Sequence, residues 1–137
     1  MRYMAFDIGS KRIGVAVSDS SEKVASAVKV VPTTDLLSDS RVIKRLVEDW
    51  EPDELIFGLP KTLSGEEGPQ AGNIRKVANQ IMNVSGLPGA FVDERLSSKE
   101  AKVYMHECGM TEKDMRGKID MVAAQIFLQS FLDSKHT

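Results

Sequence analysis

The sequence has little of what marks several protein classes. Cys108 is the only cysteine among 137 residues, so an internal disulfide is impossible and a reducing, cytoplasmic location is expected. No apolar run approaches the ~18 residues of a membrane helix, and no basic-then-apolar signal segment opens the chain. Excess positive charge is also missing, since the formal net charge is −2. A membrane protein and a DNA-coating protein are therefore disfavoured, whereas a nuclease with an acidic metal site is not.

The sequence does contain an ordinary globular composition with alternating strand and helix patterns. Hydrophobic residues make up 42% and charged residues 28%, which suits one domain over residues 1–137. Apolar runs predict strands at residues 3–6, 13–19, 24–31, 55–59 and 90–92. Amphipathic or apolar patterns predict helices at about residues 41–50, 74–82, 98–106 and 119–132. Three strands with short connections, followed by crossover helices, favour an α/β fold, a mixed five-stranded sheet with helices on both faces.

Asp7 is the residue that points most directly to function. It ends the first apolar run, and a turn containing Gly9, Lys11 and Arg12 leads into the second strand. A carboxylate on a rigid element can hold a metal in fixed geometry, and the two cations can face phosphate oxygens. A simple hairpin with a polar tip is the alternative interpretation.

Two further carboxylates follow predicted element ends. One is either Asp93 or Glu94, which follow directly on the fifth strand, and the other is Asp120, which opens the last helix. Sites in such sheets gather at the carboxyl ends of strands, so these acids and Asp7 could share one all-oxygen site for Mg²⁺ or Mn²⁺. Glu94 could instead pair with Arg95, and Asp120 could simply complement the dipole of its helix.

Four segments carry a more specific signal when taken together, namely residues 6–16, 58–60, 93–98, and 118–120 with the alanines that follow. These segments resemble the YqgF family. Its members are small proteins with an RNase H-like fold, described as candidate Holliday junction resolvases and as nucleases that mature the 5′ end of pre-16S rRNA. The resemblance spans nearly the whole chain in the right order.

The resemblance implies a role for each of six residues. The catalytic acids, which are also the metal ligands, are Asp7, Glu94 and Asp120. The phosphate contacts are Lys11, Arg12 and Arg95.

The predicted fourth strand departs from the pattern of many RNase H-like nucleases, which carry an acid there. Here it ends in residues 58–60, Gly-Leu-Pro, so Glu94 has to substitute for that acid. A fourth acid is not obvious, and Asp19 and Asp93 are the candidates. With three acids, a second metal would bind weakly.

The function that these residues favour is metal-dependent hydrolysis of phosphodiester bonds, with RNA preferred as substrate because the resemblance implies it. Ribosomal precursor particles are candidate partners. Holliday junction resolution on branched DNA stays open, as does a non-catalytic RNA- or ribosome-associated factor. Sugar kinases and actin-like ATPases also begin with a strand, Asp, Gly and a hairpin, but they need two such domains. No apolar stripe reveals a dimer surface, so the oligomeric state is open.

Two other residues are expected to be structural. Trp50 falls on the apolar face of the helix predicted at 41–50, and Cys108 is expected to behave as a small buried hydrophobe.

Overall fold

One mixed sheet organises the chain. A computed structural model describes residues 1–59, 71–93 and 103–135. Within them, five strands lie in the order β3-β2-β1-β4-β5. β3, β2 and β1 pair antiparallel, whereas β1, β4 and β5 are parallel, so the predicted mixed sheet is confirmed. The strands are β1 (Tyr3–Ile8), β2 (Arg12–Ser18), β3 (Ala25–Pro32), β4 (Glu54–Leu59) and β5 (Gly89–Asp93).

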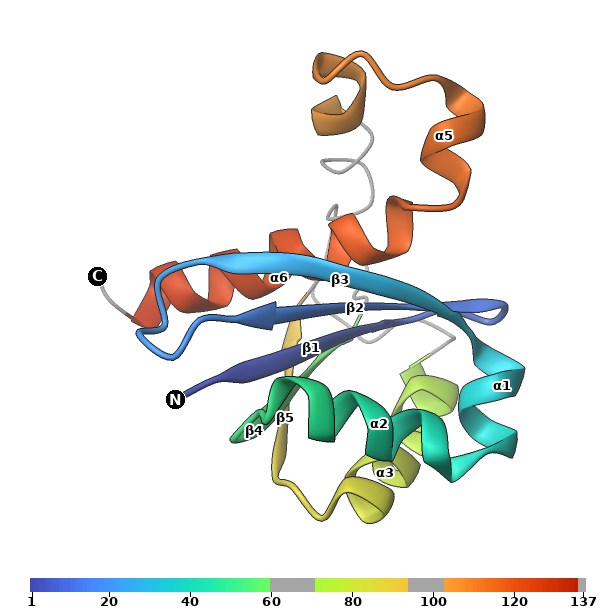
Figure 1. The fold of residues 1–137 in the computed structure, drawn as a ribbon, viewed down its shortest axis with the longest axis vertical. Helices are drawn as coiled ribbons and strands as arrows, with labels where there is room; N and C mark the ends of the chain where they lie inside the picture. The colour runs from blue at the N-terminus through green and yellow to red at the C-terminus, as the bar shows by residue number, and fades with distance from the viewer. Residues whose placement is uncertain (60–70, 94–102, 136–137) are drawn as a thin grey trace.

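Helices cover both faces of this sheet. Figure 1 shows α1, α2 and α3 on one face and α6 on the other, so the prediction of helices on both faces is confirmed. Residues 103–107 are also helical, and this segment and α5 extend beyond the sheet next to the start of α6 (Figure 1). None of the helices in the described ranges has the length and apolar character needed to cross a membrane. The bounds are α1 (Thr33–Ser38), α2 (Ser40–Trp50), α3 (Ala71–Ser85), α5 (Glu112–Arg116) and α6 (Ile119–Lys135).

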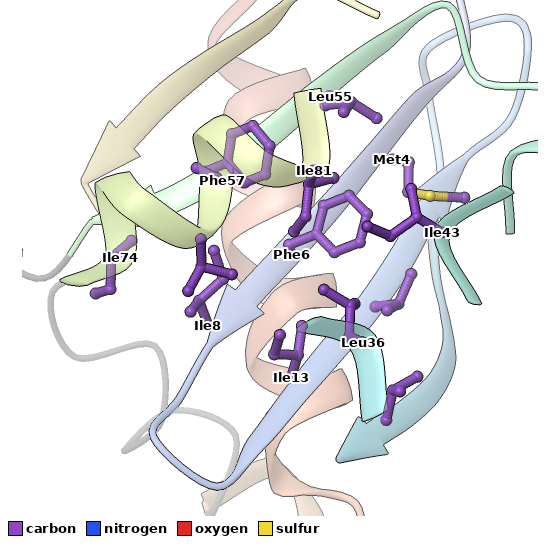
Figure 2. Packing of buried hydrophobic residues seen from close by; sticks show 14 of the residues in the cluster. Met4, Phe6, Ile8, Ile13, Leu36, Ile43, Leu55, Phe57, Ile74 and Ile81 are labelled. Atoms are coloured by element: carbon purple, nitrogen blue, oxygen red, sulfur yellow. The ribbon is translucent and has the colours of Figure 1, made fainter. Parts of the chain in front are cut away.

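The side chains of β1 alternate between two hydrophobic clusters. Met4, Phe6 and Ile8 pack against Ile43 of α2 and Ile81 of α3 in the larger cluster (Figure 2). The intervening residues point to the opposite face, because successive side chains of a strand do so. β1 is therefore buried on both sides, which explains its unbroken apolar run.

The smaller cluster lies between the sheet and α6. Tyr3 and Ala5 of β1 pack there with Phe127, Leu128 and Leu132 of α6. Helix α6 is apolar on most sides because it also receives Met105 and Met115 from residues 103–107 and α5.

Several element boundaries differ from the sequence prediction. Residues 33–38, where the sequence patterns predict no helix, form the separate helix α1, and Asp39 then caps α2 by accepting from the Arg41 amide. β3 continues through Pro32, which an edge strand tolerates because its outer N–H groups need no partner. Residues 60–70, and the expected start of the third helix at residue 98, lie outside the described residues.

The expectation that Trp50 and Cys108 are buried is wrong. Trp50 is 38% exposed because it is the last residue of α2. There it lies with Arg2 and Val24 on the wall of a surface hollow of about 500 Å³. Cys108 is exposed, since the chain turns just after the helical segment 103–107, and Gly109 follows with φ +80°.

Candidate metal and phosphate site

Asp7 lies near the carboxyl end of β1 on the face that α6 covers. Its side chain follows the alternation of Tyr3 and Ala5, which pack with α6, rather than that of Phe6 and Ile8, which pack with α2 and α3. It is only 8% exposed, and among the buried residues of the described part of the chain it alone carries a charged side chain. A carboxylate in this position needs a compensating interaction or ion.

Gly14 brings the start of α6 to Asp7. It is the register partner of Asp7 in the antiparallel β1–β2 pair, where partner Cα atoms are about 4.5–5.5 Å apart. A Cβ atom on Gly14 would lie 2.1 Å from the carbonyl carbon and oxygen of Asp120 and 2.5 Å from the amide nitrogen of Met121. The first turn of α6 therefore rests on the bare backbone of Gly14, which puts Asp120 beside the strand pair that carries Asp7.

Arg12 forms an ion pair with Asp120. Its Nε donates to Oδ2 of Asp120 at 3.1 Å, and the side chains are 49% and 22% exposed. A residue predicted to contact phosphate is thus bonded to a residue predicted to bind metal. Both groups keep access to solvent, so the pair can open when a phosphate or a cation competes for either partner.

The turn between β1 and β2 is anchored to Thr33, the first residue of α1. The Gly9 amide donates to the carbonyl of Arg12 at 2.9 Å, and a Cβ on Gly9 would lie 2.7 Å from that oxygen. Thr33 donates its amide to the Lys11 carbonyl at 3.0 Å and its hydroxyl to the Gly9 carbonyl at 2.9 Å. Three hydrogen bonds thus fix the backbone, while the side chain of Lys11 is exposed.

Two of the predicted site residues, Glu94 and Arg95, lie outside the described residues. β5 ends at Asp93, which pairs with Leu59 of β4. Because β1, β4 and β5 are parallel, their carboxyl ends lie at the same end of the sheet. Among the described residues, no group of three or more His, Cys, Asp or Glu side chains is arranged to hold a metal. The described part of the site therefore contains two of the three predicted acids.

Asp19 is not a fourth acid of this site, contrary to one candidate from the sequence. β2 runs antiparallel to β1, so Asp19 follows the end of β2 that pairs with the start of β1, at the opposite end of the sheet. Its carboxylate accepts from the Ser21 hydroxyl and from the amides of Lys23 and Val24, at 2.8 and 3.1 Å for the two amides. It closes the turn into β3.

Asp19 also gives a pH-dependent contribution to stability. Its hydrogen bonds, first that of Ser21 and then those of Val24 and Lys23, hold its pKa at about 2, below the ordinary 3.8. A depressed pKa stabilises the fold above the unfolded-state value, and this contribution is lost as pH falls from 3.8 towards 2. Asp19→Asn is expected to lower Tm at neutral pH and to flatten its fall in that acid range. Thermal unfolding at a series of pH values measures both, and parallel profiles for the two proteins would contradict this role.

Gly14 is the site residue that sequence reasoning missed. A glycine inside an apolar strand, between Ile13 and Val15, is a signal for close approach by another backbone. The sequence does not say which backbone approaches. The contact with Asp120, 106 residues further along, is visible only in the fold.

Comparison with known proteins assigns the chain to a family. The model of the RuvX family, described as Holliday junction resolvase, matches residues 1–134. The chain belongs to this family. This agrees with the resemblance to YqgF proteins noted from the motifs.

Curated relatives of this RuvX-family chain match it along almost their whole length. A protein of Anaeromyxobacter sp. (strain Fw109-5), named "Putative pre-16S rRNA nuclease", is 35% identical over 136 residues, which cover 99% of both chains. A protein of the same name from Escherichia coli O9:H4 (strain HS) is 38% identical over 130 residues, or 95% of this chain and 94% of the relative.

Solved structures show the fold of this RuvX-family member. The RuvC of T. thermophilus, in complex with a Holliday junction substrate, is similar with a TM-score of 0.60 at 14% identity, over 99% of this chain and 96% of its own. The Fowlpox virus resolvase, also in complex with Holliday junction DNA, has a TM-score of 0.60 at 13% identity over the whole of both chains. The predicted RNase H-like fold is thereby confirmed.

Proposed function

We propose that this chain is a metal-dependent nuclease that hydrolyses phosphodiester bonds during 5′-end maturation of pre-16S rRNA. One observation carries the proposal. Gly14 pairs with Asp7 and contacts the first turn of α6, so the two carboxylates Asp7 and Asp120 belong to neighbouring elements at the same end of the sheet. Family membership and the names of the curated relatives support the reaction class and the RNA substrate. We place the reaction in the cytoplasm, on ribosomal precursor particles.

The donors at this edge suit a hard divalent cation. Carboxylate oxygens are the ligands that Mg²⁺ and Mn²⁺ favour, and we propose Asp7, Asp120 and Glu94 as the set that holds one of them. When bound, such an ion supplies positive charge at the scissile phosphate and lowers the pKa of a coordinated water. The buried position of Asp7 on a paired strand keeps its carboxylate fixed before the ion arrives.

The cations of the β1–β2 turn are proposed to bind the substrate backbone. Lys11 and Arg12 project from a turn held by three hydrogen bonds, so the backbone that carries them is fixed before binding. We assign Arg95 the same role. Arg12 then exchanges Asp120 for a phosphate oxygen, which frees the Asp120 carboxylate as the substrate enters.

Replacing Arg12 with Gln tests this exchange. The affinity for RNA is expected to fall roughly three- to tenfold, and the slope of log K against log salt to become shallower by about 0.7. Without RNA, Mn²⁺ affinity is expected to rise, because Asp120 loses a competing cation. Calorimetry measures both affinities. Lys23→Gln, which removes an exposed cation beside Asp19 at the far end of the sheet, is the control. Unchanged RNA and Mn²⁺ affinities in Arg12→Gln would contradict the exchange.

Holliday junction resolution is the second candidate function, favoured by the description of the matching family. Two coordinated cuts in a four-way junction need a dimer, whereas trimming an RNA end needs one subunit. Digestion of four-way DNA junctions, single-stranded RNA and structured rRNA precursor should be compared side by side with Mg²⁺ and Mn²⁺. The proposed function expects cleavage of the precursor, and preferential junction cleavage by a dimer would replace it. RNA binding without metal-dependent cleavage would indicate a non-catalytic factor.

A further inference from the structure

A basic groove of about 390 Å³ lies between the edge strand β3 and helix α2, away from the acids of the candidate site. We propose that this groove is a second phosphate-binding surface that holds the backbone of the nucleic-acid substrate beyond the cleavage point. The proposal rests on the proposed nuclease function. The groove is lined by Lys29, Asp39, Arg41, Val42, Arg45 and Leu46.

The charge of the groove favours an anionic partner. Three cations and one carboxylate line it, in a chain whose formal net charge is −2. The groove is therefore locally positive although the chain as a whole is negatively charged. A local positive patch of this kind lets an acidic protein attract a polyanion. The apolar floor formed by Val42 and Leu46 adds contact for the sugar edges without adding negative charge.

The two arginines of the groove keep donors available for phosphate. Nε and Nη2 of Arg41 donate to Oδ1 and Oδ2 of Asp39, both at 2.9 Å. The remaining N–H groups of the guanidinium are not needed for this pair. Arg45 lies 3.7 Å from Asp49, and its side chain is 78% exposed. Solvent screens exposed ion pairs of this kind and leaves them weak, so a phosphate can displace the carboxylate.

The strand register places the groove within reach of the site. Pro32 pairs with Arg12, and Lys29 pairs with Val15, so Lys29 lies three residues back along β3 from the position beside Arg12. At about 3.3 Å per residue this is about 10 Å, or roughly three nucleotides of a helical strand.

The path between the two surfaces runs over the outer edge of the sheet. Asp7 faces α6, whereas Lys29 and α2 border the groove on the other side of the sheet. β3 is the edge strand, so a backbone leaving Arg12 can pass around it without crossing another strand. An alternative role for Lys29 is to blunt this exposed edge against pairing with other chains, and that role involves no nucleic acid.

A pair of charge-matched double variants tests the proposal. Lys29→Gln with Arg45→Gln removes two cations of the groove and leaves the Arg41–Asp39 pair at the start of α2 intact. Lys23→Gln with Lys76→Gln removes two exposed cations elsewhere, in the β2–β3 turn and on α3. Binding is measured without divalent metal, to single-stranded RNA of about 20 nucleotides and of about 2 nucleotides, the second being shorter than the roughly three nucleotides that separate the two surfaces. Thermal unfolding checks that both variants are folded.

The groove variant is expected to bind the long RNA roughly tenfold more weakly at ~0.1 M salt, with a salt slope shallower by about 1.4. Its affinity for the short RNA, and both affinities of the control variant, are expected to change less than about twofold. Equal weakening by the two variants, or no change with the long RNA, would overturn the proposal. The proposal would also be overturned if the wild-type protein bound no RNA. If the long-RNA effect appears but the wild type cleaves nothing with Mg²⁺ or Mn²⁺, the groove stands and the nuclease function fails.

Discussion

Replacing Asp7 with Asn is expected to reduce RNA cleavage roughly a thousandfold or more, to background, while the protein stays folded. Asn preserves the size and shape of the side chain but cannot supply the anionic oxygen that a divalent cation requires. Because Asp7 is only 8% exposed, its ionised carboxylate carries a desolvation cost in the folded protein that the neutral Asn side chain does not. The free energy of unfolding in metal-free buffer is therefore expected to be unchanged or higher in the variant.

Initial cleavage rates at saturating Mn²⁺ and urea unfolding in the presence of a chelator give the two readouts. Asp133→Asn is the matched control, because Asp133 lies exposed on α6 and accepts a hydrogen bond only one turn away, from Gln129. This control is expected to cleave at the wild-type rate. Cleavage retained by Asp7→Asn would remove Asp7 from the chemistry, and a variant that fails to fold would make the residue structural.

Replacing Gly14 with Ala is expected to give the largest loss of stability of any single methyl addition in the described residues. The new Cβ would lie 2.1 Å from the backbone of Asp120, so α6 must move away from β2. The free energy of unfolding is expected to fall by about 3 kcal/mol, at the upper end for overpacking, because backbone atoms rather than flexible side chains must shift. Mn²⁺ affinity is expected to fall as well, since Asp120 moves with the helix.

Gly72→Ala is the control for this substitution. A Cβ there meets nothing within 4 Å, and the position lies in α3. Helical alanine in open space is expected to stabilise the protein by about 0.5–1 kcal/mol. Urea unfolding of both variants, with Mn²⁺ titration of any Gly14→Ala protein that folds, measures the difference. If Gly14→Ala had the same stability and Mn²⁺ affinity as the wild type, the close contact between Gly14 and α6 would be contradicted.

Much of the sheet is predictable from local patterns. The unbroken apolar run of β1 reflects burial on both faces, and Pro32, Pro52 and Gly86 punctuate the elements around it. Helix α1 escaped prediction because six residues are too few to show a helical period. Trp50 has the spacing expected of a buried residue, but it is the last residue of α2. Hydrophobic periodicity alone does not predict where a helix ends.

The candidate site is predictable in its residue types but not in its contacts. A carboxylate at the end of a strand, as at Asp7, follows from the sequence and from the rule that sites lie at strand ends. The Arg12–Asp120 pair joins residues 108 positions apart, and such a pairing depends on how α6 packs on the sheet. Gly14 sets that packing, so the decisive residue carries no functional group at all.

Anomalous diffraction from crystals grown with Mn²⁺ is the most direct measurement of whether these carboxylates share an ion. We expect a peak about 2.0–2.4 Å from oxygens of both Asp7 and Asp120, with the Arg12 guanidinium displaced from Asp120. No peak at that position under saturating Mn²⁺, in protein that still cleaves RNA, would contradict the central proposal.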